Sequence, residues 1–387
     1  MAFKSEFKGA IMNRGLTKFL SLFIFDKEKK QAFRIKHDAI ERLRQRLSNE
    51  RGRINYLEFS LCRLTMNVSP NIDIDYLHGL NTNQVSNLEE HKQNVEALKA
   101  NLEEESLHNL NKILNIIEKL KFSKIFLPEN FYTGEEFEAY KAHVDMEYEI
   151  EPHDGYWQYK KYKLPVKFFC QNVFVDKHGL HKLKTLAKMC KDSVIIDAGG
   201  CICDSALIFR EFCPDNKIIS FEPGKKNYEW GLKTIELNNL DNIIYENMAL
   251  GAEKKILFMS ENSYNIGAQA IIGDCASNQK HNEHACQAIS LDEYVKKHNL
   301  KVGLIKTDLE GFEQQLLDGA INTIKEQKPI LLISIYHNYH DFYKIKPWLE
   351  SLNLGYKFNF FKGCDGHPSA EILLIGEVYY GIRYYKS

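Results

Sequence analysis

Short apolar runs alternate with helical segments from about residue 162 onward, and this alternation constrains the fold more than any other feature of the sequence. The runs of strand length lie at 194–196, 217–221, 242–245, 302–305 and 330–335. Helical segments lie between the first three runs and between the last two, at 205–212, 227–237 and 313–326. Because parallel strands need long crossover connections, this order predicts a doubly wound α/β domain with a mostly parallel sheet and helices on both faces.

Two further apolar runs, 356–361 and 370–378, have no helix between them. Their link, KGCDGHPS, is rich in turn-forming residues, so the two runs are expected to pair as an antiparallel hairpin. The predicted domain covers residues 163–387 and ends in this hairpin.

The part of the chain before this domain has a different character. We predict a mainly α-helical N-terminal region over 1–125 and a linker or cap, rich in acidic and aromatic residues, over 126–162. Within the helical region Leu88, Val95 and Leu102 recur every seven residues. Such a stripe joins two helices, either within one chain or in a homodimer.

The beginning of the chain combines apolar and basic residues. Leu16, Phe19, Leu20 and Phe23 have helical spacing, and a basic stretch follows at 27–53. An amphipathic helix with cationic flanks could lie peripherally on the anionic inner face of a membrane. The alternative is a helix that packs on its own domain and keeps a solvated charged face.

Charge and cysteine content narrow the class of protein. The chain carries 51 Lys and Arg against 52 Asp and Glu, so no basic field favours a nucleic-acid partner. Nine cysteines show no disulfide-like framework. Without a signal-peptide pattern, and without an apolar run of the roughly 18 residues that span a membrane, we expect reduced thiols and a cytoplasmic protein.

The end of the first predicted strand, in VIIDAGGCICDSALIF, is the first place where a ligand could bind. Its candidate contacts are Asp197, Gly199, Gly200, Asp204 and Ser205. The dinucleotide pattern G-x-G-x-x-G is missing, which disfavours a pyrophosphate. An acidic turn with glycines suits instead a ligand that carries a cationic amino group and a sulfonium.

The second predicted strand ends in ISFEPGKKNY, where Glu222 and Pro223 follow an apolar run. A carboxylate at this position can accept hydrogen bonds from both ribose hydroxyls of a nucleoside, as in dinucleotide-binding folds. The alternative is a solvent-exposed Glu at a strand end.

The fourth predicted strand ends in KTDLEGFE, where Lys306, Asp308 and Glu310 alternate, and His337 follows the fifth strand. These residues are candidates for a general base, a substrate clamp or metal ligands, and the alternative is a cluster that caps the next helix. The His281, His284 and Cys286 spacing fits no zinc site. A divalent cation at Asp308 and Glu310 is a further hypothesis.

The ordered set DAGGCICDSAL, ISFEPGKKNY, ELNNL, SLDEY, KTDLEGFE and KPILLISIYHNYHDF resembles the FkbM-type methyltransferases over about residues 178–378. The resemblance implies a Rossmann-like fold with seven strands, S-adenosyl-L-methionine as cofactor and O-methylation as the activity. The helical opening resembles those of bacterial enzymes that build surface glycans, which implies a sugar or glycan acceptor.

Carried over to this chain, the family motifs imply that the turn from Asp197 to Asp204 holds the methionine part of the cofactor. They imply that Glu222 holds the ribose and that Met248 and Ala249 line the adenine. Cys203 stands where such sequences usually have glycine, which would matter if that position needs a positive φ.

For the chemistry we expect His337 or Asp308 to be the general base, with Glu310 orienting the acceptor. Two other classes remain open. An NAD-linked sugar-modifying enzyme could use a similar sheet, and a membrane-associated scaffold could keep the fold without catalysis.

Overall fold

The computed structural model describes residues 88–123, 132–189, 191–260, 271–273, 283–365 and 369–379. All of these described residues belong to one compact unit within 73–387. The predicted amphipathic helix near Leu16 and the basic stretch lie outside the described residues. Among the helices that can be described, none has the length and apolarity to cross a membrane.

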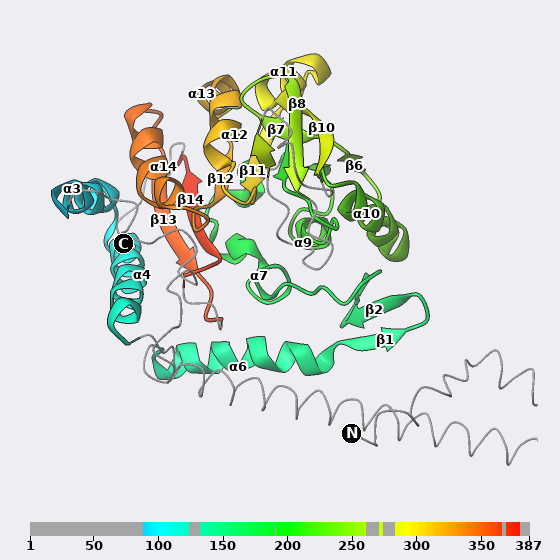
Figure 1. Ribbon diagram of the computed structural model, residues 1–387, viewed down its shortest axis with the longest axis horizontal. Coiled ribbons are helices and arrows are strands. Elements are labelled where there is room, and N and C mark those ends of the chain that lie inside the picture. The colour runs from blue at the N-terminus through cyan, green and yellow to red at the C-terminus, as the bar shows by residue number, and fades with distance from the viewer. Residues whose placement is uncertain are drawn as a thin grey trace, which may run out of the picture. The chain divides into compact units, whose positions relative to one another are not determined.

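Seven strands form the central sheet within the described ranges, in the order β13-β14-β12-β11-β4-β5-β6. Their bounds are β4 (Val194–Ala198), β5 (Lys217–Phe221), β6 (Ile243–Glu246), β11 (Val302–Thr307), β12 (Ile330–Ser334), β13 (Lys357–Lys362) and β14 (Ile372–Glu377). Strand β14 runs antiparallel to both of its neighbours, and the other pairs are parallel. The predicted Rossmann-like sheet with a C-terminal hairpin is confirmed (Figure 1).

Alternate residues of the central strands face two hydrophobic clusters, because side chains alternate along a strand. In β4, Val194, Ile196 and Ala198 join one cluster and Ile195 the other. The first cluster lies under α11 (Leu291–His298), α12 (Glu313–Gly319), α13 (Ile321–Gln327) and α14 (Tyr339–Ser351). The second lies under α9 (Ser205–Phe212), α7 (Gln171–Phe174) and part of α10 (Lys225–Asn238).

The described N-terminal helices α3 (Leu88–Lys99) and α4 (Glu104–Ser123) pack on the sheet domain, against α14 and β13. Lys346 is fully buried there and donates to the backbone oxygen of Ala100 at 2.6 Å. This bond satisfies a carbonyl just after the end of α3. Val95 and Leu102 pack against the first hydrophobic cluster, so these two residues of the heptad-like stripe make an intrachain contact. The predicted boundary at residue 125 stays a prediction.

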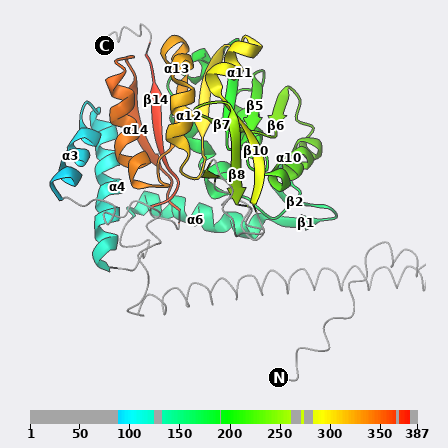
Figure 2. The ribbon, with the colours of Figure 1, turned by 45° about the horizontal axis from the view of Figure 1, so that its top comes forward.

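The predicted linker or cap contains regular structure that the sequence analysis did not foresee. Helix α6 (Gly134–Glu149) begins with a capping box at Thr133 and leads to a three-stranded antiparallel sheet (Figures 1 and 2). That sheet consists of β1 (Glu151–His153), β2 (Tyr156–Tyr159) and β3 (Tyr162–Leu164). The short helices η3 (Lys177–Lys182) and α8 (Leu186–Met189) follow α7 and lead into β4.

A second sheet fills the long connection between β6 and β11. Its four described strands are β7 (Ala249–Gly251), β8 (Lys255–Ser260), β9 (Ile271–Gly273) and β10 (Glu283–Ser290). The sequence analysis treated this connection without strands, and its His281 lies outside the described residues. Strands β7 and β8 place their residues beside the ends of β4 and β5.

Candidate active site

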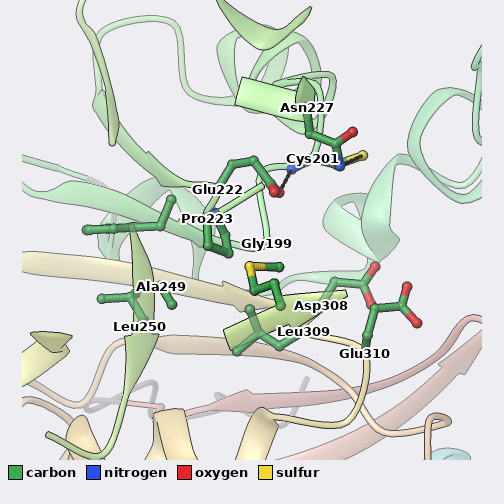
Figure 3. A pocket seen from close by; sticks show the side chains of 12 residues that line it. Gly199, Cys201, Glu222, Pro223, Asn227, Ala249, Leu250, Asp308, Leu309 and Glu310 are labelled. Carbon is green, nitrogen blue, oxygen red and sulfur yellow. Dashed lines mark hydrogen bonds between the residues drawn. The ribbon is translucent and has the colours of Figure 1, made fainter. Parts of the chain in front are cut away.

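A cavity of about 530 Å³, including its part open to solvent, lies at the carboxyl ends of β4, β5 and β11. This is the edge at which open α/β sheets bind ligands. We call one part the Glu222 side, which comprises Gly199, Cys201, Glu222, Pro223, Asn227, Ala249, Leu250 and Met259. The other is the Asp308 side, which comprises Asp308 and Glu310 in the cavity (Figure 3). It also includes His337 and Tyr336, which lie next to Asp308, and Glu371, which lies next to Tyr336.

The turn after β4 depends on two glycines. Gly199 has φ +79°, and a Cβ there would collide with the carbonyl oxygen of Asp308. A Cβ on Gly200 would collide with the hydroxyl of Ser220. Only glycine therefore lets this turn lie so close to the ends of β5 and β11.

Four residues other than glycine in and around the site also have positive φ. They are Cys201 at +47°, Cys203 at +62°, Glu310 at +54° and Glu371 at +56°. Backbone in this region is strained, and such residues tend to cluster at functional sites. Cys203 thus stands in a conformation that favours glycine, and its side chain is fully buried.

Glu222 is held by backbone donors. Its Oε2 accepts from the Cys201 N–H at 3.0 Å (Figure 3). Its Oε1 accepts from the Gly224 N–H at 2.7 Å. Burial raises the pKa of Glu222 to about 8, although these two bonds oppose the shift. Each carboxylate oxygen keeps lone-pair capacity for a further donor from the cavity.

Apolar side chains complete the Glu222 side. Ala249 and Leu250 from β7 and Met259 from β8 line the cavity. Met248, which was predicted beside Ala249, packs against the hydrophobic core instead. Met248 is not among the residues that line the cavity, and its contact with the adenine stays a prediction.

Asp197 and Lys306 lie beneath the cavity rather than in it. Their side chains form an ion pair at 3.2 Å, and both are almost fully buried. Lys306 also donates to the Gly199 carbonyl at 2.9 Å, and Ser220 donates to Asp197 at 2.7 Å. Burial lowers the pKa of Lys306, but the surrounding carboxylates outweigh this and raise it overall. The pair fixes the turn, so Lys306 does not occupy the predicted catalytic position.

Asp204 and Ser205 also support the turn. Asp204 caps α9 by accepting from the Ser205 N–H, and burial raises its pKa to about 7. The Ser205 hydroxyl lies 2.9 Å from Nε2 of buried His178. Neither side chain belongs to the cavity lining.

His337 lies among three carboxylates on the Asp308 side. Its Nδ1 is 3.1 Å from Glu313, and its Nε2 is 3.4 Å from Asp308 and 3.8 Å from Glu310. Burial lowers the pKa of His337, but Glu313, Asp308 and Glu310 raise it to about 10. Near neutral pH the ring is therefore an imidazolium, which is a poor proton acceptor and a strong stabiliser of negative charge.

Single ligand atoms of Asp308, Glu313 and His337 lie within 4.8 Å of one another, a spacing that a metal ion can use. Here both ring nitrogens of His337 already face carboxylates. The imidazolium thus supplies the positive charge that the cluster needs.

Several residues of the site were missed from the sequence. Tyr336 and Glu371 lie behind Asp308, with the Tyr336 hydroxyl 3.3 Å from Asp308 and 3.4 Å from Glu371. Glu371 directly precedes β14, which is antiparallel and so begins where the parallel strands end. The antiparallel hairpin predicted from the sequence already implied that the start of its second strand lies at this edge of the sheet. Cys201, Asn227 and Met259 are further cavity residues that we had not singled out.

Comparisons with known proteins agree with this architecture. Residues 197–358 match the family model of the methyltransferase FkbM domain. A protein of Beauveria bassiana (strain ARSEF 2860) named Methyltransferase 1 is 25% identical, over 49% of this chain and 81% of that protein.

Two solved structures are similar at low identity. Methyltransferase FkbM from Methylobacillus flagellatus KT is 16% identical with a TM-score of 0.47. That match covers 74% of this chain but only 60% of the Methylobacillus flagellatus chain, which is less than two thirds of the length of that chain. The Pyrococcus abyssi tRNA (uracil-54, C5)-methyltransferase, in complex with S-adenosyl-L-homocysteine, is 9% identical over 59% of this chain and 43% of that one, with a TM-score of 0.30.

Proposed function

This chain contains a methyltransferase domain of the FkbM type over residues 197–358, and on that premise we propose that it uses S-adenosyl-L-methionine to methylate a hydroxyl oxygen. The acceptor that we propose is a sugar of a surface glycan or of its precursor. The observation that carries the proposal is the cavity with Glu222 on one side and the Asp308–Glu310 pair on the other.

The Glu222 side offers polar and apolar groups that suit the nucleoside part of the cofactor. The free lone pairs of Glu222 suit the two ribose hydroxyls, and the apolar surface of Ala249, Leu250 and Met259 suits an adenine. The turn at Gly199 and Cys201 would hold the methionine part.

The cofactor supplies a methyl group on a sulfonium, which an acceptor oxygen attacks in line. The protein must align the acceptor and take its proton during the attack. Asp308 and Glu310 line the cavity and are the proposed bases, with burial raising the pKa of Glu310 to about 7. His337, a cation at neutral pH, holds these carboxylates rather than acting as the base.

We further propose that transfer needs no divalent cation, because His337 provides the positive charge beside Asp308 and Glu310. Methyl transfer in a chelator should then stay within about twofold of the untreated rate, a change worth less than 1 kcal/mol in the barrier.

The partners remain those expected from the sequence. We propose a sugar or glycan acceptor, no nucleic acid, a peripheral contact with an anionic inner membrane through the N-terminal helix, a homodimer and a cytoplasmic location. The nearly balanced charge of the chain supports the absence of nucleic acid.

The test is transfer of an isotopically labelled methyl group to methyl hexosides and to cell-surface polysaccharide fractions, followed by linkage analysis of the methylated sugar. The proposal expects O-methyl sugars that disappear with Asp308→Asn. Label on nitrogen or carbon, or equal labelling by the variant, would contradict it.

A further inference from the structure

Three oxygen-bearing side chains lead away from the cavity on the Asp308 side. Oδ1 of Asp308 lies 3.3 Å from the Tyr336 hydroxyl, which lies 3.4 Å from Oε1 of Glu371. Asp308 lines the cavity, Tyr336 is buried at 7% exposure, and Glu371 is half-buried. The distances are long for hydrogen bonds between oxygens, but catalytic hydrogen bonds often tighten only when substrate is bound.

The three residues come from three different strand ends. Asp308 follows β11, Tyr336 follows β12, and Glu371 precedes the antiparallel β14. Asn172 at the start of α7 donates its amide N–H to Oε2 of Glu371. That bond leaves Oε1 facing the tyrosine hydroxyl.

When the cavity is filled, a proton on Asp308 needs another path to solvent. Asp308 keeps 24% side-chain exposure, which bound cofactor and acceptor would cover. The neighbouring His337 cannot take the proton from Asp308, since its ring is already protonated at neutral pH. A proton received by Asp308 therefore needs a route that does not pass through the occupied cavity.

We propose that Tyr336 and Glu371 form a proton relay that carries the acceptor's proton from Asp308 toward solvent. The inference rests on the proposed function. The acceptor O–H bond breaks toward Asp308, the new O–CH₃ bond forms, and the electron pair of the S–CH₃ bond goes to sulfur. The proton on Asp308 passes to the Tyr336 oxygen while the Tyr336 proton passes to Glu371, so the tyrosine is neutral before and after.

The surroundings of Glu371 fit the end of a relay. The titratable groups that face it are Asp308, Tyr336, Asp365, Lys362, His337 and Cys170. Burial, then Asp308 and Asp365, raise the pKa of Glu371 to about 8. Its ionised form can accept a proton from the relay, and its partial exposure lets that proton leave.

Two variants test the relay, Tyr336→Phe and Glu371→Gln. Tyr356→Phe is the matched control, because that hydroxyl bonds to the Pro329 carbonyl at the opposite edge of the sheet. The probes are methyl hexosides for turnover and S-adenosyl-L-homocysteine for binding. We expect kcat to fall about 100-fold in both variants, which is the lower end of the rate loss seen when general acid–base catalysis is removed. The KM for the acceptor and the Kd for the cofactor should stay within threefold of the wild-type values. The wild-type kcat should rise with pH through about 8, and the rise should be smaller in Glu371→Gln, which lacks the contribution of Glu371.

An infrared measurement needs no acceptor. The pH 6 spectrum of wild-type protein minus that of Glu371→Gln should contain a band of protonated carboxyl that belongs to Glu371. This band should be shifted in Tyr336→Phe, because the tyrosine oxygen is its hydrogen-bond partner. Unchanged kcat and pH profiles in the two variants, or an unshifted band, would overturn the relay. Failure of wild-type protein to bind S-adenosyl-L-homocysteine, or binding without turnover of any hydroxyl acceptor, would instead overturn the proposed function.

Discussion

The Glu222 side and the Asp308 side of the cavity are built in different ways. Glu222 is fixed by two backbone N–H groups, and the turn that supplies one of them is held by two glycines. The Asp308 side is fixed by side chains, with His337 between Asp308 and Glu313. A rigid backbone site suits a ligand of constant shape. A charged side-chain cluster suits a step in which charge develops.

The largest effect is expected from Gly199→Ala, because Gly199 is where the two sides touch. The new methyl group would meet the Asp308 carbonyl in a conformation that L-residues rarely adopt. We expect a loss of about 4 kcal/mol of unfolding free energy. Gly134→Ala is the control, since a Cβ there has open space. Urea titration measures the free energy of unfolding of both variants. Equal values for Gly199→Ala and Gly134→Ala would contradict the claim that the turn at Gly199 holds the two sides together.

His337→Gln should have the next largest effect. It leaves Glu313, which is fully buried, without its cation, and breaking a buried pair costs about 3 kcal/mol. The double variant His337→Gln/Glu313→Gln should regain part of that loss. Cofactor affinity of the folded variant should stay within threefold, because the Glu222 side is untouched. A calorimetric titration that showed a tenfold loss would mean that the two sides are not independent.

Both sides should make the free protein less stable as pH rises. Glu222 and Glu310 have folded pKa values of about 8 and 7, above the ordinary 4.5, and His337 has about 10 against 6.5. Each folded group holds its proton to higher pH than the unfolded chain does, so the stability that it contributes is complete at low pH. It is lost between about pH 4.5 and 8 for the carboxyls and between about 6.5 and 10 for His337. We expect Tm to fall by about 3 °C or more from pH 6 to pH 9. Scanning calorimetry of Glu222→Gln should show a smaller fall, and a Tm that rises with pH would contradict the assignment.

Cys203→Gly should have the smallest effect. Relief of the left-handed strain is worth about 1 kcal/mol, and the loss of a small buried side chain costs about the same. Stability should change by less than about 1 kcal/mol, and cofactor affinity by less than twofold. Cys203→Val, a β-branched residue at positive φ, should be clearly less stable in the same urea titration. A large gain in affinity for Cys203→Gly would show that the cysteine weakens the cofactor turn.

The sequence indicated that Glu222 and Asp308 lie at the same edge of the sheet, and both line the cavity. Periodicity and turn residues locate the ends of parallel strands, which is why this much could be predicted. Lys306 is buried beneath the turn in an ion pair with Asp197, a placement that strand alternation alone does not reveal. The role of His337 depends on Glu313, Asp308 and Glu310, whose distances only the folded chain defines.

The three-stranded sheet β1-β2-β3 was not predicted from the sequence either. The strands at Glu151–Leu164 are only three or four residues long, too short for a period-two pattern to stand out. Glu371 escaped notice because it precedes a strand, while the search for site residues followed strand ends.

Calorimetric titration with S-adenosyl-L-methionine and S-adenosyl-L-homocysteine, with NAD as the control ligand, tests the central claim most directly. Wild-type protein, Glu222→Ala and Asp308→Asn should be compared under one set of conditions. The account predicts binding of both sulfur ligands and not of NAD, an affinity about 100-fold weaker in Glu222→Ala, and a change within threefold in Asp308→Asn. Binding of NAD alone, or equal losses in the two variants, would contradict the assignment of the Glu222 side to the cofactor.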